Sequence, residues 1–192
     1  MDTSEPRTRI VATADELYNA KGIQAVGMDE LRAAAGVSLK RLYQEFPSKS
    51  SIVMAVLERR HASWTEGLDA TVRQAATPRE RLLAIFDYLA AWFCEDSFRG
   101  CGFINSFAEL GAISPEVAEY ARKHKESFQN YVGHLAREAG APAYLAPQLS
   151  ILAEGAQTTA AIAGTPDAAR QARAAAEVLI DAALGVEDPD GT

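Results

Sequence analysis

The sequence has little cysteine, few glycines and prolines, and no long uninterrupted run of apolar residues. Two cysteines, Cys94 and Cys101, are too few for a disulfide scaffold and do not form a Cys-x-x-Cys pair. With 13 glycines and 8 prolines in 192 residues, the chain is neither collagen-like nor of low complexity. No apolar stretch approaches the ~20 residues that span a bilayer, and no apolar signal segment opens the chain. These absences predict a cytoplasmic protein with reduced thiols.

Basic side chains are outnumbered by acidic ones, 19 to 26, and the formal net charge is −7. The charge is unevenly distributed, however. Residues 1–60 hold nine basic and eight acidic side chains and so carry +1, whereas residues 61–192 hold ten basic and eighteen acidic ones and carry −8. A nearly neutral amino-terminal segment permits contact with a polyanion such as DNA without requiring it. The hydrophobic content of 48% is that of a globular protein with an ordinary core.

Apolar residues recur at helical spacing along the chain, and no sustained alternation typical of strands is present. Glycine and proline mark the helix ends, as Gly22 does after the first helix and Pro47 after the third. The predicted helices are 6–21, 28–35, 39–46, 48–74, 78–93, 103–110, 115–138, 147–163 and 167–184. We therefore predict an all-α protein of about nine helices. Its expected domains are residues 1–47 and residues 48–192, connected by the helix over 48–74.

Residues 28–46 have the pattern of a helix-turn-helix, with two short helices joined by a tight turn at Gly36. In the second of these helices, Leu42 and Phe46 are four residues apart and are predicted to point inward. The opposite side presents cations and a tyrosine hydroxyl near the helix start, which is the layout that a helix in the DNA major groove needs. The spacing alone fits a generic helical hairpin with a solvated basic face equally well.

The residues at these positions are more specific than their spacing. The string AGVSLKRLYQEFPSKSSIV, preceded by ADELYNAKGIQAVGMDEL, resembles the N-terminal domain of the tetracycline-repressor (TetR) family. The matching elements are Gly36-Val37-Ser38, Leu42-Tyr43, Phe46, Ser48-Lys49 and Gly22. The resemblance is strong over residues 1–60 and rests beyond them on the number and order of helices. It implies a three-helix DNA-binding domain followed by a helical domain for ligand binding and dimerisation, in a transcriptional regulator that is most often a repressor.

The resemblance also implies which residues contact DNA. The predicted DNA-binding residues are Arg32, Ser38, Leu39, Lys40, Arg41, Tyr43, Gln44 and Lys49. Tyr43 would donate a hydrogen bond to a phosphate, and Gln44 would face the base edges. Because a lysine at a helix start gains nothing from the helix dipole, its position there favours an anionic partner for Lys49. A solvated surface lysine is the alternative.

Four positions depart from the family pattern. Gly27 lies where a capping serine or threonine is common, so a phosphate contact is expected to be missing there. Arg32 replaces a usually small residue, and it either reaches a phosphate or is solvated. The pair Lys40-Arg41 replaces a frequent pair of a small residue and threonine, which predicts a different base preference. Glu45 lies where histidine is frequent, and its carboxylate would repel phosphate unless it turns away.

Aromatic residues are numerous in the second half of the chain. Core packing explains most such side chains taken singly, but in the family the fourth, fifth and seventh helices surround a ligand cavity, and this sequence has aromatics on all three. The implied ligand-binding residues are Trp64, Phe86, Leu89, Phe93, Phe103, Phe107, Tyr120, His124, Phe128 and Gln157. Such a lining predicts a small apolar or amphipathic effector.

Two alanine-rich segments, about 147–163 and 167–184, allow helices to approach closely. The resemblance implies that they pair with their copies in a four-helix homodimer interface, and a two-fold dimer would bind a palindromic operator. Internal packing alone is the other explanation of these alanines.

Catalytic motifs are missing from the sequence. It has no GxSxG, HExxH, P-loop or GxGxxG in a strand-turn-helix setting. Four carboxylates could line a di-metal helical bundle, but such a site needs two Glu-x-x-His pairs and the sequence has one, Glu58 with His61. The two cysteines lack the His/Cys cluster of a zinc site, so buried structural cysteine is favoured over a thiol sensor. We predict no enzyme, metal or cofactor, and no membrane contact. The alternative to a DNA-binding regulator is a helical small-molecule sensor that acts through a protein partner.

Overall fold

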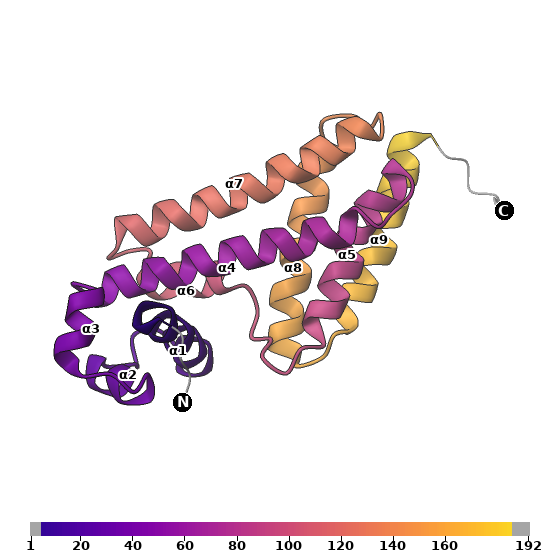
Figure 1. Ribbon diagram of the computed structural model, residues 1–192. Helices are drawn as coiled ribbons and strands as arrows, with labels where there is room; N and C mark the ends of the chain where they lie inside the picture. The colour runs from indigo at the N-terminus through magenta and orange to yellow at the C-terminus, as the bar shows by residue number, and fades with distance from the viewer. Residues whose placement is uncertain (1–4, 186–192) are drawn as a thin grey trace. The chain divides into compact units, whose positions relative to one another are not determined.

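The computed structural model describes residues 5–185, and within them the chain forms nine α-helices and no strand (Figure 1). The helices are α1 (Pro6–Lys21), α2 (Met28–Ala34), α3 (Leu39–Glu45), α4 (Lys49–Val72), α5 (Pro78–Phe93), α6 (Gly102–Leu110), α7 (Pro115–Glu138), α8 (Leu145–Ala163) and α9 (Asp167–Leu184). The predicted all-α fold is confirmed. None of the described helices is both long and apolar enough to cross a membrane.

Local capping interactions explain where several helices begin and end. Gly22 ends α1 with φ of 85°, and its N–H donates to the carbonyl of Tyr18 at 2.9 Å. The Oγ of Ser38 accepts from the N–H of Arg41 at 3.1 Å and so caps α3. Helix α8 begins two residues before the predicted start, because Pro147 fits within a first turn whose N–H groups have no intrahelical partners.

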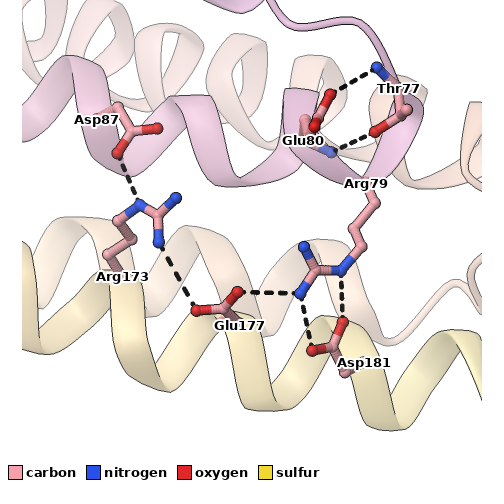
Figure 2. Close-up of polar contacts among 7 residues, drawn as sticks. All are labelled: Thr77, Arg79, Glu80, Asp87, Arg173, Glu177 and Asp181. Atoms are coloured by element: carbon pink, nitrogen blue, oxygen red, sulfur yellow. Dashed lines mark hydrogen bonds and ion pairs between the residues drawn. The ribbon is translucent and has the colours of Figure 1, made fainter. Parts of the chain in front are cut away.

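Helix α5 begins with a reciprocal capping box (Figure 2). The Oγ1 of Thr77 accepts from the N–H of Glu80 at 3.2 Å, while the Glu80 carboxylate accepts from the N–H of Thr77 at 3.0 Å. These hydrogen bonds lower the pKa of the Glu80 carboxyl. The Thr77-Pro78 start predicted from sequence is therefore confirmed.

The chain divides into two compact units. Unit 1 comprises the residues up to Ser63 together with Gly102–Arg122, and unit 2 comprises Trp64–Cys101 together with the residues from Lys123 onward. Two of the three boundaries between segments fall inside long helices, α4 and α7, and the third falls at the start of α6. The predicted division into residues 1–47 and 48–192 stays a prediction.

In unit 1, the short helices α2 and α3 are tied to α1 by arginines. The Arg9 Nε donates to the carbonyl of Ala35 at 2.9 Å, just beyond the end of α2. The Arg7 guanidinium donates to the carbonyl of Glu45 at 2.8 Å and lies 4.1 Å from the ring centroid of Phe46. These contacts fix the orientation of α3, which is too short to be stable by itself.

In unit 2, α5, α8 and α9 share an apolar core of aliphatic, aromatic and alanine side chains. At the edge of this core, an ion-pair network joins α5 to α9 (Figure 2). Arg79 forms two hydrogen bonds with the Asp181 carboxylate, at 2.6 and 2.8 Å, and a third with Glu177 at 3.0 Å. Arg173 pairs with Asp87 at 2.7 Å and with Glu177 at 3.7 Å. The hydrogen bonds from Arg79 lower the pKa of the Asp181 carboxyl.

Candidate nucleic-acid interface

Helix α3 has one buried side and one exposed side. Leu42 and Phe46, four residues apart, are 0% and 1% exposed, as their spacing predicts. On the other side, Leu39 is 39% exposed and Tyr43 is 48% exposed. Large apolar and aromatic side chains displayed together on a seven-residue helix indicate a surface that meets a partner.

Six of the eight predicted DNA-binding residues lie together on this exposed surface. They are Ser38, Leu39, Lys40, Arg41, Tyr43 and Gln44, and each is exposed. The surface therefore combines a hydroxyl, an aromatic hydroxyl, an amide and two cations, which are the groups that contact phosphates and base edges. The DNA-binding role of each of these residues stays a prediction.

The cations on α2 and α3 differ in their partners. Arg41 is paired with Glu45 on the same helix at 2.5 Å, and Arg32 is paired with Asp29 at 2.9 Å. The Arg41 guanidinium thus balances the charge of the Glu45 carboxylate, which reduces the repulsion of a DNA phosphate expected from its position. Lys40 forms no ion pair within residues 5–185, so its ammonium is the cation most available to a phosphate.

Lys49 occupies a different environment. It is the first residue of α4, and its Nζ donates to the carbonyl of Gln24 at 3.4 Å, in the turn between α1 and α2. Partial burial lowers the pKa of its ammonium, while the negative charge of Glu109 opposes that shift. Its predicted contact with the DNA backbone would have to be made from this half-buried position.

Glu109 of α6 holds the same turn, and sequence reasoning missed this role. Its two carboxylate oxygens accept from the N–H groups of Ile23 at 3.1 Å and Gln24 at 3.0 Å. In return, the Gln24 side-chain amide donates to the carbonyl of Glu109 at 2.9 Å. We call this set of contacts the Glu109 clamp. Because the partners are 85 and 86 residues apart, no local sequence pattern predicts them.

Several predicted ligand-binding residues gather around Trp64 in unit 2. The Trp64 ring lies edge-on to His124 and Phe128, with centroids 5.3 and 5.2 Å apart. It also contacts Tyr88 at 6.0 Å, a ring outside the predicted set. His124 is 6% exposed and lies against Trp64, so it is a buried polar side chain beside an aromatic ring.

The remaining predicted ligand-binding residues of unit 2 lie deeper. Phe86 and Leu89 are fully buried in its apolar core, as is nearly all of Phe93. Gln157 of α8 is 3% exposed. Phe93 stacks in a tilted arrangement on Phe98, at 4.7 Å, a second contact that the sequence did not indicate.

Unit 1 contains the other three predicted ligand-binding residues. Phe103 and Tyr120 contact each other at 6.0 Å and both contact His61, at 6.5 and 6.2 Å. Phe107 instead has a 54% exposed side chain. The aromatic residues named from sequence thus form separate groups within the two units, and their role in ligand binding stays a prediction.

The cysteines differ in exposure. Cys94 is exposed, and Cys101 is buried with its Sγ 3.5 Å from the Lys125 Nζ. Within the part of the chain that the structure describes, no group of three or more His, Cys, Asp or Glu residues is placed to hold a metal ion.

Apolar side chains are exposed on α8 and α9. Ile151 and Ile162 of α8 are 74% and 83% exposed, and Val178 of α9 is 69% exposed. The opposite sides of both helices are buried in the core of unit 2 through their alanines. Each helix therefore has an apolar residue on its outer side as well as an apolar inner side.

Two family models match this chain. Residues 10–56 match the model described as bacterial regulatory proteins of the tetR family. Residues 78–176, just over half of the chain, match the tetracyclin repressor-like C-terminal domain. The chain belongs to the TetR family. The resemblance found in the sequence is confirmed, and TetR-family proteins are DNA-binding transcriptional regulators, a class distinct from enzymes.

Two TetR-family relatives differ in the sign of regulation that their names state. The HTH-type transcriptional activator FasR of Mycolicibacterium smegmatis is 30% identical over 148 residues, 77% of this chain and 66% of FasR. The HTH-type transcriptional repressor NemR of Escherichia coli is 27% identical over 115 residues, 59% of this chain and 58% of NemR. The chain thus spans less than two thirds of the length of these curated relatives.

Solved TetR-family structures share the fold over nearly the whole chain. A TetR-family transcriptional regulator from Streptomyces coelicolor has a TM-score of 0.87 at 23% identity, covering 93% of this chain and 96% of that one. A putative TetR regulator from Streptomyces avermitilis has a TM-score of 0.81 at 28% identity, covering 94% and 98%.

Proposed function

We propose that this TetR-family regulator is a repressor that binds a palindromic operator as a homodimer and is released by a small effector. The observation that carries the proposal is the exposed side of α3, where Leu39 and five polar, cationic or aromatic residues lie opposite the buried Leu42 and Phe46. A helix with this division can lie in the major groove while its buried side stays attached to the domain.

Within this surface, the chemistry of each side chain gives it a role. Gln44 can pair with an adenine edge through its amide, and the exposed Arg41 and Lys40 can reach guanine or phosphate. The Tyr43 hydroxyl donates to a phosphate oxygen, which positions the helix without reading sequence. Arg41 exchanges its Glu45 partner for DNA when it binds a phosphate, whereas Lys40 has no ion-pair partner to release among the described residues.

For the effector, we propose a small apolar or amphipathic molecule bound by the predicted aromatic residues. In unit 2, the group around Trp64 supports this, because the buried imidazole of His124 and the ring of Phe128 both lie edge-on to Trp64. Apolar walls with a few polar groups are typical of small-molecule sites. The effector would favour a state whose two recognition helices no longer match major grooves ~34–36 Å apart. Effector and operator must then weaken each other's binding by the same factor.

For the dimer, we propose an interface formed by α8 and α9 of two copies. The exposed Ile151, Ile162 and Val178 support this assignment, since large apolar side chains in such positions gain from burial against a second copy. A two-fold interface of this kind explains why the operator would be palindromic. A regulator that acts on the genome in this way would work in the cytoplasm.

A salt-titrated binding isotherm tests the proposal. The full chain is mixed with duplex DNA from upstream of its own gene and, in parallel, with a scrambled duplex. We expect binding at least ~10³-fold tighter to the native duplex, and a steep loss of affinity as salt increases. Lys40→Ala should weaken binding and flatten the salt slope by about one unit. The matched control is Arg122→Ala, which removes one exposed positive charge from α7.

Different outcomes separate the proposal from its alternative. Equal, weak binding to both duplexes calls for a selection from random duplexes, which would find an operator located elsewhere. If that selection also enriches no sequence, the operator-binding proposal is wrong, and a sensor that acts through a protein partner replaces it.

A further inference from the structure

Helix α3 carries two neighbouring cations, and their surroundings differ. Lys40 forms no ion pair within residues 5–185, whereas the Arg41 guanidinium is paired with the Glu45 carboxylate, with Nη2 2.5 Å from an Oε1 acceptor. Both cations carry N–H groups that can bind guanine or phosphate. The partner of Arg41 therefore distinguishes what the two cations can do on DNA.

The backbone under this pair is anchored near both ends of α3. The N–H of Arg41 donates to the Oγ of Ser38 at 3.1 Å, in the cap that starts the helix. The carbonyl of Glu45 accepts from Arg7 of α1 at 2.8 Å, and the next residue, Phe46, is buried. The Glu45 side chain is 18% exposed and that of Arg41 is 49% exposed. The carboxylate is thus mostly shielded from solvent, and the guanidinium that it holds is open to a partner.

The guanidinium has enough donors for two partners at once. It carries five N–H groups in one plane, and the contact with Glu45 runs through Nη2. Guanine presents two acceptors in the major groove, N7 and O6, which arginine binds with two N–H groups. Because guanine is uncharged, Arg41 can bind it without giving up Glu45. A phosphate is different, because two anions would then compete for one guanidinium and repel each other.

We propose that Arg41 reads a guanine of the operator and that Glu45 positions its guanidinium for that base. This assignment rests on the proposed contact of α3 with the operator. A free arginine side chain loses conformational freedom when it binds, and the pair with Glu45 removes part of that loss beforehand. The same pair keeps Arg41 from the phosphates and so lowers the affinity for unrelated DNA. Lys40, whose ammonium is a compact charge, is left to contact a phosphate.

The test begins with a selection from random duplexes by the full chain, which yields the operator. Each G·C pair of the operator is then replaced by A·T, and binding isotherms are measured. At one guanine, replacement should weaken binding by the unmodified chain roughly five- to 150-fold. A guanine analogue that lacks only the N7 acceptor should also weaken binding there, and it tests the base contact without any protein variant. Arg41→Ala should bind all three duplexes with the same affinity.

Glu45→Gln keeps the shape of the side chain and removes its charge. It should lower the discrimination at that guanine roughly two- to tenfold, because Arg41 is no longer held in place. It should also raise the affinity for a scrambled duplex and steepen the salt slope by about one unit, since Arg41 becomes free to contact a phosphate. A purely structural role for Glu45 predicts a different result, an equal loss of affinity for every duplex.

Glu30→Gln is the matched control. Glu30 of α2 is paired with Lys21 at the same distance, 2.5 Å, so this variant removes an equal charge from a similar pair in unit 1. Neither residue belongs to the predicted DNA contacts, and the discrimination at the guanine should stay that of the unmodified chain. Circular dichroism verifies that the three variants are folded before binding is measured.

Different results contradict different steps. A selection that enriches no sequence would overturn the proposed function and this inference with it. An operator at which Arg41→Ala loses no guanine discrimination would overturn the assignment of Arg41, while operator binding would stand. Full guanine discrimination by Glu45→Gln, or an equal loss of its affinity for every duplex, would overturn the positioning role of Glu45.

Discussion

The two units of this regulator hold their helices in different ways. Unit 1 supplements its buried apolar side chains with polar contacts between distant parts of the chain, such as Arg7 with the Glu45 carbonyl and Glu109 with the turn at Ile23 and Gln24. Unit 2 relies on a large apolar core shared by α5, α8 and α9, with ion pairs only at its edge. The difference follows from helix length, because α2 and α3 have seven residues each and can bury little apolar surface.

This difference determines what each unit reveals about function. On α3, the hydroxyl, amide and cationic groups that can contact DNA are exposed to solvent. Phe86, Phe93 and Phe128 of unit 2 are buried in its core, and these side chains serve packing whether or not an effector binds. Function is therefore easier to assign in unit 1 than in unit 2. Five substitutions test this comparison, from the largest expected effect to the smallest.

Phe86→Ala tests whether a predicted ligand-binding residue of unit 2 is mainly a core residue. Phe86 is 0% exposed, so its truncation should lower the free energy of unfolding by about 3–5 kcal/mol. Urea unfolding followed by circular dichroism measures this. Phe107→Ala is the matched control, and at 54% exposure it should change the free energy of unfolding by no more than about 0.5 kcal/mol. If both variants lost similarly little free energy of unfolding, packing in the core would not be the main role of Phe86.

Gln44→Ala and Tyr43→Phe separate base reading from phosphate contact on α3. Gln44→Ala should cost about 1–3 kcal/mol of discrimination at one operator position. Tyr43→Phe should weaken binding to every duplex alike, because it removes a phosphate donor. Binding isotherms against an operator and its single-base variants measure both effects. A uniform loss of affinity from Gln44→Ala would contradict its base-reading role.

Arg79→Met tests the ion-pair network at the edge of unit 2 (Figure 2). The network is partly exposed, so at neutral pH the substitution should lower the free energy of unfolding by about 1 kcal/mol. The loss should be smaller in high salt. Arg170→Met, which removes an exposed pair with Asp167, should cost less.

The same network gives a pH dependence. Pairing lowers the pKa of Asp181 below its ordinary value of 3.8. Its contribution to stability is therefore complete above pH 3.8 and is lost as the pH falls through the lowered pKa of the folded state. Unfolding free energies of the unmodified chain and Arg79→Met should converge below that value, and a gap that persists would contradict this explanation.

Gly27→Ser has the smallest expected effect. Gly27 precedes α2 with φ of −83° and ψ of 160°, and no side-chain hydrogen bond caps the helix. A Cβ at this position would meet no atom within 4 Å. A serine hydroxyl would cap α2 and should raise the free energy of unfolding by about 0.3 kcal/mol. Gly36→Ser is the contrasting variant, because φ of 63° at Gly36 strains any side chain, and it should destabilise the chain. Thermal melts compare the two.

The sequence predicted the helices well because their signals are local. Gly22, Ser38 and Thr77 each act on a helix end within a few residues, and all three helix ends are confirmed. The inward direction of Leu42 and Phe46 also follows from spacing alone.

Contacts across long sequence separations could not be predicted. The Glu109 clamp joins residues 85 and 86 positions apart, and nothing near either end encodes the pairing. The half-buried position of Lys49 against Gln24 was missed for the same reason. The pair of Arg41 with Glu45, in contrast, is a four-residue helical spacing that the sequence does display.

The Glu109 clamp has a consequence during protein synthesis. Ribosomes add about 5–20 residues per second, so Glu109 emerges about 4–17 s after Gln24, from which it is separated by 85 residues. Throughout that interval the nascent chain already contains the whole helix-turn-helix but lacks the carboxylate that holds the turn in front of it. A truncated translation product that ends before α6 would therefore contain the DNA-reading residues without the carboxylate that holds the preceding turn. It would compete poorly with the full chain for the operator.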